Sequence, residues 1–238
     1  VGGGVVMGVL YNSRIVTDDL ILCLDAGDKM SYPGAGTTWT DLSGRGNHFT
    51  LSGPVFSENN TSSYFEFGDN QGDYAYRSTT DVIGGGRYIT VDMWILITTL
   101  QDDIAFLSYA TSSYNNEFLL YKKPDAIRHY WGTSNASVSL SSSYYNVGNW
   151  INLVFRRGSS TANYSFNGIQ RASMAGTDDY IDAGGTLVFG QEQDSPGGGF
   201  VNAEDFPGYI NSLKIYNRYL TNDEIRQNYN ATKARFGL

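Results

Sequence analysis

Apolar and polar residues alternate along many short stretches of this chain, and this alternation limits the folds that it can adopt. The clearest stretch is YITVDMWILIT, residues 88–98. One of its faces would carry Ile89, Val91, Met93, Ile95 and Ile97, and the other would carry Thr90, Asp92 and Trp94. A period of two residues is typical of a half-buried strand in an antiparallel sheet. Further strand-like runs cover residues 104–111, 116–123, 127–133, 150–157, 187–193 and 209–218.

A hairpin is predicted where Asn167 and Gly168 lie between two alternating segments of residues 163–172. Both residue types tolerate the positive φ angles of a two-residue turn, so this pair is the strongest short-range hairpin signal. The composition agrees, because 18 Tyr and 28 Gly with only 17% charged residues favour short strands and turns over helices. We therefore predict an all-β fold, a two-sheet antiparallel jelly-roll sandwich with Greek-key connections.

One short helix is predicted near the C-terminus, where Thr221 and Glu224 form a capping-box pattern before apolar residues at helical spacing. No linker rich in Pro or Ser interrupts the series of strands, so residues 15–238 are expected to form a single domain. Residues 1–14, which begin VGGGVVMGVL, are expected to form a flexible arm that becomes ordered only against a neighbour.

Charge and cysteine content argue against several classes of function. The formal net charge of −8 disfavours nucleic acid as a partner, because phosphates require a basic surface. Cys23 is the only cysteine and lies in an apolar run, so we expect it to be buried and no internal disulfide can form. The only two histidines give no plausible zinc cluster with it. Membrane insertion is not expected, since no apolar run approaches the roughly 18 residues of a span.

The segment GQEQDSPGGGF, residues 190–200, is the part of the sequence that most suggests a functional site. Glu192 and Asp194 place two carboxylates on one turn, where they repel each other unless a cation or a hydrogen-bond donor lies between them. Calcium takes about six to eight oxygens from carboxylates, amides and backbone carbonyls, and the glycines at 197–199 leave the backbone free to fold around it. A solvated turn without a metal would have a similar composition.

Three segments closely resemble the pentraxin family. They are FLSYATSSYNNEFLLYKK (residues 106–123), GQEQDSPGGGF (190–200) and GYINSLKIYNRYLTNDEIRQNY (208–229). The earlier segment LDAGDKMSYPGAGTTWTDLSGRGNH, residues 24–48, is similar instead to the wider group of laminin-G-like and concanavalin A-like lectin domains, in particular those of tailed-phage structural proteins. Both resemblances imply the same jelly-roll sandwich.

The pentraxin resemblance implies a calcium site built from two loops that are far apart in the sequence. Carried over position by position, its ligands are Asn115, Asn116, Glu192, Gln193 (through the backbone carbonyl), Asp194 and Glu204. Asn115 stands where the family has Asp and Glu204 where it has Gln, so the total number of carboxylates is about the same. Val201 replaces an acidic ligand of the family's second ion, so one calcium ion is expected to bind firmly and a second one more weakly.

The same resemblance implies a ligand whose oxygens complete the calcium shell. Tyr121 stands at the aromatic position of the family's phosphocholine pocket, and Glu117, the acid after the Asn pair, is the other predicted ligand-binding residue. The region of the family's choline-holding acid reads Ser134-Asn135-Ala136 and has no carboxylate, which argues against phosphocholine as the specific ligand. A cell-surface glycan or a phosphorylated ligand is expected instead.

These features predict a calcium-dependent, lectin-like recognition module that is not an enzyme. We expect it on a virion surface or another extracellular particle, beside other particle proteins and as a homo-oligomer, because many copies give avidity to weak single contacts. One alternative is a structural decoration protein of a capsid or tail, in which calcium only stabilises a loop. The other is a glycoside hydrolase, but Glu192 and Asp194 lack the third acid of the related hydrolases' catalytic strand.

Overall fold

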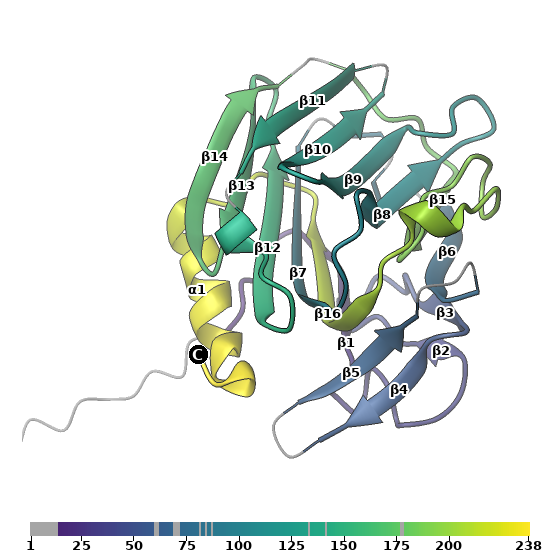
Figure 1. The fold of residues 1–238 in the computed structure, drawn as a ribbon, viewed down its shortest axis with the longest axis vertical. Helices are drawn as coiled ribbons and strands as arrows, with labels where there is room; N and C mark the ends of the chain where they lie inside the picture. Colours follow the sequence, from purple (N-terminus) through teal and green to yellow (C-terminus); the bar gives the residue numbers. More distant parts are fainter. Residues whose placement is uncertain are drawn as a thin grey trace, which may run out of the picture.

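Two eight-stranded sheets pack face to face in the structure of this chain, a computed structural model, and form a β-sandwich (Figure 1). The structure describes residues 14–59, 62–68, 72–80, 82–83, 85–86, 88–132, 134–140, 142–176 and 179–238. Apart from Arg14, the predicted N-terminal arm lies outside these residues. Every strand pairing within the described residues is antiparallel, as predicted.

We call the two sheets sheet A and sheet B. In spatial order, sheet A contains β14 (Ile169–Ala175), β13 (Thr161–Phe166), β12 (Trp150–Arg157), β7 (Ile89–Ile97), β16 (Gly208–Tyr216), β5 (Ser63–Phe67) and β4 (Val55–Glu58), and β1 (Leu20–Asp25) also pairs with β16. Sheet B contains β11 (Ser134–Ser139), β10 (Ala126–Trp131), β9 (Phe118–Lys123), β8 (Ile104–Ala110), β15 (Gly185–Phe189), β6 (Tyr74–Thr80), β3 (Phe49–Ser52) and β2 (Thr38–Trp39). Neighbours in each sheet are often distant in sequence, so loops from different parts of the chain meet at its edges.

The helical elements are short. They are α1 (Asn222–Thr232) and the 3₁₀ turns η1 (Ser142–Tyr144), η2 (Asn202–Glu204) and η3 (Lys233–Phe236). The capping box at the start of α1 is confirmed, because the Thr221 side chain accepts from the Glu224 backbone N–H and Glu224 reaches back to the Thr221 N–H. None of the described helices is long and apolar enough to cross a membrane.

The hydrophobic core lies between the two sheets. Its largest side chains are fully buried and come from both sheets, among them Trp39, Phe49, Phe65, Phe106, Phe118 and Tyr164. Cys23 is buried, as predicted, in a smaller cluster with Tyr216 and Ile225. The predicted hairpin is confirmed too, since Asn167 and Gly168 join β13 to β14 with φ angles of 50° and 76°.

Strand β7 corrects the prediction that one of its faces is exposed, because all nine of its residues are buried. The second face is covered by α1, which lies along one side of the sandwich in Figure 1. Trp94 Nε1 donates to Thr232 Oγ1 at 2.9 Å, and Asn228 Nδ2 donates to Asp92 Oδ2 at 3.0 Å. The alternation therefore separates core-facing residues from helix-facing residues, whose polar atoms are hydrogen-bonded rather than solvated.

Candidate functional site

The segment between β15 of sheet B and β16 of sheet A, which we call the β15–β16 loop (residues 190–207), is closed by backbone hydrogen bonds near its two ends. At its neck, Gly190 N–H donates to Phe106 O at 3.2 Å and Phe206 N–H donates to Gly190 O at 3.0 Å. Gly190 has a φ of 91°, and a Cβ there would lie 2.8 Å from Phe67 Cδ1, so glycine is required at this turn. In Figure 1 the loop is yellow-green and lies beside β8 and β15.

Hydrogen bonds to Ser108 of β8 hold the loop against the outer face of sheet B. Ser108 Oγ donates to Gln191 O at 2.7 Å and accepts from Gln193 Nε2 at 3.1 Å. Gln193 Nε2 also donates to Thr186 O at 2.9 Å, and Gln193 Oε1 accepts from Gly197 N–H at 2.8 Å. The buried Gln193 side chain therefore fixes the shape of the acidic turn, which leaves its backbone carbonyl as the group available to an ion.

The structure brings this loop to the turn between β8 and β9, as the resemblance implied. Asn115 Nδ2 donates to Asp194 Oδ1 at 3.1 Å. The side chain of Asn116, the next residue, lies beside Glu192 of the loop. Two segments that are more than 70 residues apart thus share one cluster of side-chain oxygens, and this cluster includes four of the six predicted calcium ligands.

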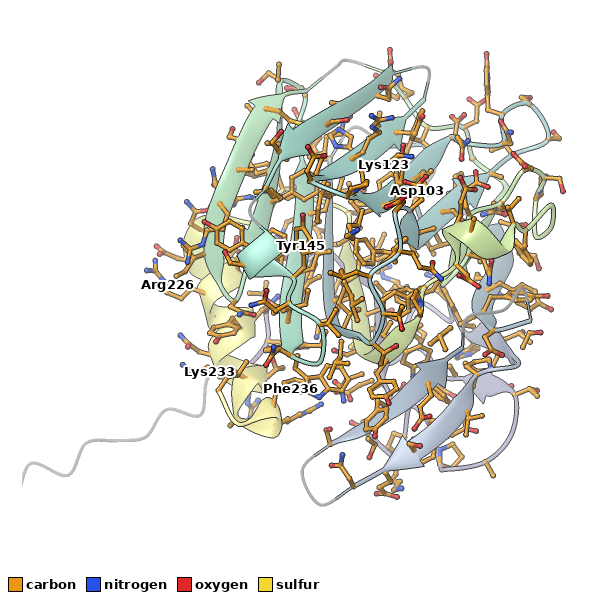
Figure 2. The ribbon with its side chains drawn as sticks, viewed as in Figure 1. Asp103, Lys123, Tyr145, Arg226, Lys233 and Phe236 are labelled. Atoms are coloured by element: carbon orange, nitrogen blue, oxygen red, sulfur yellow. The ribbon has the colours of Figure 1, made fainter. Side chains whose placement is uncertain are left out.

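Next to this cluster lies a cavity of about 180 Å³ on the outer face of sheet B. It is lined by Asp103, Ala105, Asn116, Leu119, Tyr121, Lys123, Arg128, Tyr130, Glu192 and Glu204. Four of these residues were predicted from the sequence as calcium or ligand contacts, namely Asn116, Tyr121, Glu192 and Glu204. The charged groups at 103, 123 and 128 were not predicted. Figure 2 shows the labelled side chains of Lys123 and Asp103 beside each other, and Lys123 Nζ lies 2.6 Å from Asp103 Oδ1.

The acids around the cavity disfavour one another's charge. The pKa of Glu192 is raised to about 7, first because burial penalises its charged form and then because of the negative charges of Asp194 and Glu204. The neighbouring amide of Asn116 acts in the opposite direction. Burial, followed by the charge of Asp103, also raises the pKa of Glu204. In such surroundings a positive ion would favour the ionised form of both carboxylates.

Some oxygens in this cluster are buried without a hydrogen-bond partner. Asn116 Oδ1 and Glu192 Oε2 accept no hydrogen bond, although buried polar atoms are rarely left unsatisfied. A hard cation such as calcium binds carboxylate and amide oxygens of this kind. Within the described residues, no three His, Cys, Asp or Glu side chains form a metal cluster by themselves. An ion here would therefore also need amide or backbone oxygens, such as those of Asn116 and Gln193.

The two predicted ligand-binding residues differ in position. Tyr121 lines the cavity, and its hydroxyl accepts from Arg128 Nη1 at 3.2 Å. Glu117 is only 2% exposed and is not among the lining residues. Its Oε1 accepts from the Asp182 N–H at 2.6 Å, so the side chain is directed to the segment before β15, away from the cavity.

The alternation of residues along β9 and β10 could have indicated part of the charged cavity wall. Tyr121 and Lys123 are two residues apart on β9, and Arg128 and Tyr130 are two residues apart on β10, so each pair shares one face of its strand. The residues that lie opposite each other on the two strands are set by the register between them, which the sequence does not give. In the structure Arg128 lies opposite Tyr121.

Comparison with known proteins places the chain in a family. The family described as "Concanavalin A-like lectin/glucanases superfamily" matches residues 69–226, about two thirds of the sequence. The chain belongs to this superfamily. C-reactive protein 3.3 of Limulus polyphemus is 26% identical over 145 residues, which cover 58% of this chain and 60% of that protein. Human Pentraxin-4 is 51% identical over a shorter stretch of 45 residues, 19% of this chain and 9% of that protein. The chain thus spans about 60% of the length of the C-reactive proteins that it matches.

Solved structures agree on the fold of this superfamily member. The heptameric SAP-like pentraxin from Limulus polyphemus matches with a TM-score of 0.59 and 23% identity, over 71% of this chain and 82% of that one. The binding domain of Paraclostridial Mosquitocidal Protein 1 matches with a TM-score of 0.68 and 16% identity, over 90% and 52% of the two chains. The predicted sandwich and the pentraxin resemblance are therefore confirmed. The superfamily's description names lectins and glucanases alike, so a choice between binding and hydrolysis depends on the site.

Proposed function

We propose that residues 15–238 form a calcium-dependent, non-enzymatic recognition module. The observation that carries this proposal is the pair of buried oxygens, Asn116 Oδ1 and Glu192 Oε2, that no donor satisfies in a cavity wall crowded with carboxylates. Two costs arise here, the burial of oxygens without a partner and the repulsion among the acids. A cation removes both, because it binds those oxygens and its positive charge offsets the negative charges.

The residues that would hold the ion are Asn115, Asn116, Glu192, Gln193 (through its backbone carbonyl), Asp194 and Glu204. Bound calcium would supply open coordination positions for a phosphate, carboxylate or hydroxyl group of the ligand. The chain's own contribution is to position the oxygens. Asn116 presents its amide oxygen beside Glu192, and the anchored Gln193 side chain fixes the turn that carries Asp194.

The biological setting belongs to the same proposal. The N-terminal resemblance to phage structural domains favours display on a virion or another extracellular particle, next to other particle proteins. A relative described as a heptameric pentraxin favours an oligomer. Several copies on one particle would bind a glycan or a phosphorylated surface group with the avidity that a single small cavity lacks.

Calcium titration of the chelator-treated protein tests the proposal. We expect isothermal titration calorimetry to give saturable binding by the wild type and binding weaker by about 100-fold or more by Glu192→Gln, with Arg226→Gln as the control for a charge change on the surface of α1. Retention on a glycan and phosphoglycan array should then require calcium and vanish with chelator. Calcium binding without retention would favour the structural alternative, and release of reducing sugar from glucans would favour the hydrolase. Failure to bind calcium would refute the proposal.

A further inference from the structure

Arg128 is a basic residue of the cavity whose hydrogen-bond partners are uncharged. Its Nε donates to Ser137 Oγ at 2.6 Å and its Nη1 donates to the Tyr121 hydroxyl at 3.2 Å. Tyr130, whose ring stacks on that of Tyr121, lines the same cavity. Both hydrogen-bond partners are hydroxyl groups, so they hold the half-buried guanidinium in place without neutralising its charge.

Lys123, in the same cavity, provides the contrast. Its ammonium group forms an ion pair with Asp103 at 2.6 Å. Among the described residues, no carboxylate lies within ion-pairing distance of Arg128. The cavity therefore presents one compensated cation and one uncompensated cation.

The aromatic part of the cavity is already occupied by these two cations. Lys123 Nζ lies 5.2 Å from the centroid of the Tyr121 ring, and Arg128 Cζ lies 5.8 Å from it. Tyr130 stacks against the same ring with centroids 5.9 Å apart. A positively charged ligand group directed at Tyr121 would meet the uncompensated charge of Arg128, whereas a negative group would be attracted by it.

Arg128 and the acidic cluster lie at different ends of the cavity. Arg128 is on β10, and the register puts it opposite Tyr121 of β9, which in turn lies opposite Ala105 of β8. The loop that carries Glu192 is anchored on β8. Neighbouring strands are about 4.8 Å apart, so roughly 10 Å separates the two ends. A cavity of about 180 Å³ is small compared with the sites of drug-sized ligands and suits one compact group bridging the ends.

We propose that Arg128 makes this site select ligands with a second anionic group, such as a carboxylate, held by a short spacer from the group that completes the calcium shell. The proposal rests on the proposed function and adds a ligand class to it. Acidic sugars and anionic phosphate esters belong to this class, and ligands with a cationic end do not. Arg128 acts as a specificity residue that contacts the ligand directly through the guanidinium donors not used by its hydroxyl partners.

Three phosphate esters that differ in the charge of the distal group provide the test. Phosphoglycolate carries a carboxylate, ethyl phosphate is neutral there, and phosphocholine carries a quaternary ammonium group. In saturating calcium we expect the wild-type affinity to fall in that order, with about a tenfold or larger difference between the first and the last. This comparison needs no variant, so it stands even if a substitution at Arg128 disturbs folding.

Variants then assign the preference to Arg128. Arg128→Gln should bind phosphoglycolate and ethyl phosphate equally, Arg128→Lys should keep part of the preference, and Arg226→Gln should keep all of it. Arg226 is a matched control because it lies on α1, well away from Lys123 in Figure 2. Calcium titration and thermal unfolding of each variant verify that the ion site and the fold are intact.

The outcomes separate this inference from the proposed function. Calcium binding with equal affinity for all three esters would overturn the role of Arg128 and leave the recognition module standing. A preference that persists in Arg128→Gln would also overturn it. Absence of calcium binding by the wild type would overturn both proposals.

Discussion

The outer faces of the two sheets bury acidic side chains in opposite ways. On sheet A, both carboxylate oxygens of Asp92 accept hydrogen bonds, from Asn152 Nδ2 at 2.7 Å and from Asn228 Nδ2 at 3.0 Å. Beside sheet B, Glu192 is buried too, but its Oε2 has no hydrogen-bond partner, and burial together with the charges of Asp194 and Glu204 disfavours its ionised form.

This difference distinguishes a structural network from a candidate binding site. On sheet A, Asn228 of α1 and Asn152 of β12 each supply an amide donor, so both carboxylate oxygens of Asp92 are satisfied. A glycine-rich loop covers sheet B and supplies more acid. Buried groups that lack partners and shift one another's pKa are typical of functional sites, whereas satisfied networks stabilise the fold.

Removing the aromatic contact between sheet A and its helix should have the largest effect on stability. Trp94 is 1% exposed and stacks on Phe236 with ring centroids 4.0 Å apart. We expect Trp94→Ala to lower the free energy of unfolding by about 3–5 kcal/mol in urea denaturation. Calcium affinity of the folded variant should stay unchanged, because sheet A is not part of the site. Loss of calcium binding while the fold persists would contradict the separation of the two faces.

Matched substitutions of the two buried acids should change stability in opposite directions. Asp92→Asn places an amide N–H₂ against amide donors and should cost about 1–3 kcal/mol. Glu192→Gln removes a charge that its neighbours repel, so the calcium-free protein at pH 7.5 should gain roughly 2 kcal/mol. Calcium affinity should fall by about 100-fold or more in the second variant alone. Equal destabilisation by both would show that Glu192 is part of an ordinary structural network.

The pH dependence of stability gives a second test of Glu192. Its pKa in the folded chain, about 7, lies above the ordinary value of 4.5, so the folded state holds a proton that the unfolded state has released between these values. The contribution of Glu192 to stability is therefore full below pH 4.5 and is lost as the pH rises to 7. Buried His129, whose pKa burial lowers to about 4, has the opposite slope between pH 4 and 6.5.

The difference between wild type and Glu192→Gln cancels the His129 contribution. Plotted against pH in the absence of calcium, this difference should grow from about pH 4.5 and level off above pH 7. Saturating calcium should reverse its sign at neutral pH, since the ion stabilises only the wild type. A flat difference would mean that Glu192 is not perturbed by its neighbours.

Much of the fold could be predicted because its signals are local. The Asn167-Gly168 turn and the Thr221–Glu224 capping box each depend on a few consecutive residues, and the structure confirms both. The buried second face of β7 could not be predicted, because the helix that covers Trp94 comes from the far end of the chain. Alternation reveals two faces of a strand, but it does not reveal what packs against the polar one.

The site was predictable only where a resemblance supplied the pairing of distant loops. The resemblance predicts that Asn115 and Asp194 lie in one cluster, and in the structure Asn115 Nδ2 lies 3.1 Å from Asp194 Oδ1. It gave no information on Arg128, whose position opposite Tyr121 follows from the register of β9 and β10. Glu117 directly follows Asn116 in the sequence but does not line the cavity. Its side chain accepts a hydrogen bond from the Asp182 N–H instead.

The smallest predicted effect comes from the glycines of the acidic turn. Gly199 has a φ of 75°, and a Cβ there would lie 2.7 Å from Asp194 Cβ. Gly199→Ala should cost about 1–2 kcal/mol and weaken calcium binding severalfold, because Asp194 must shift. Gly184→Ala is the matched control, with a φ of 81° and nothing within 4 Å of the added Cβ. It should cost a similar conformational penalty and leave calcium affinity unchanged.

A crystal structure grown in calcium measures the central claim most directly. The account predicts an ion bound between the two turns, with Asn116 Oδ1 and Glu192 Oε2 both at coordination distance, about 2.3–2.6 Å. A well-ordered structure in which those two oxygens face each other across water alone, with the ion absent despite saturating calcium, would contradict it.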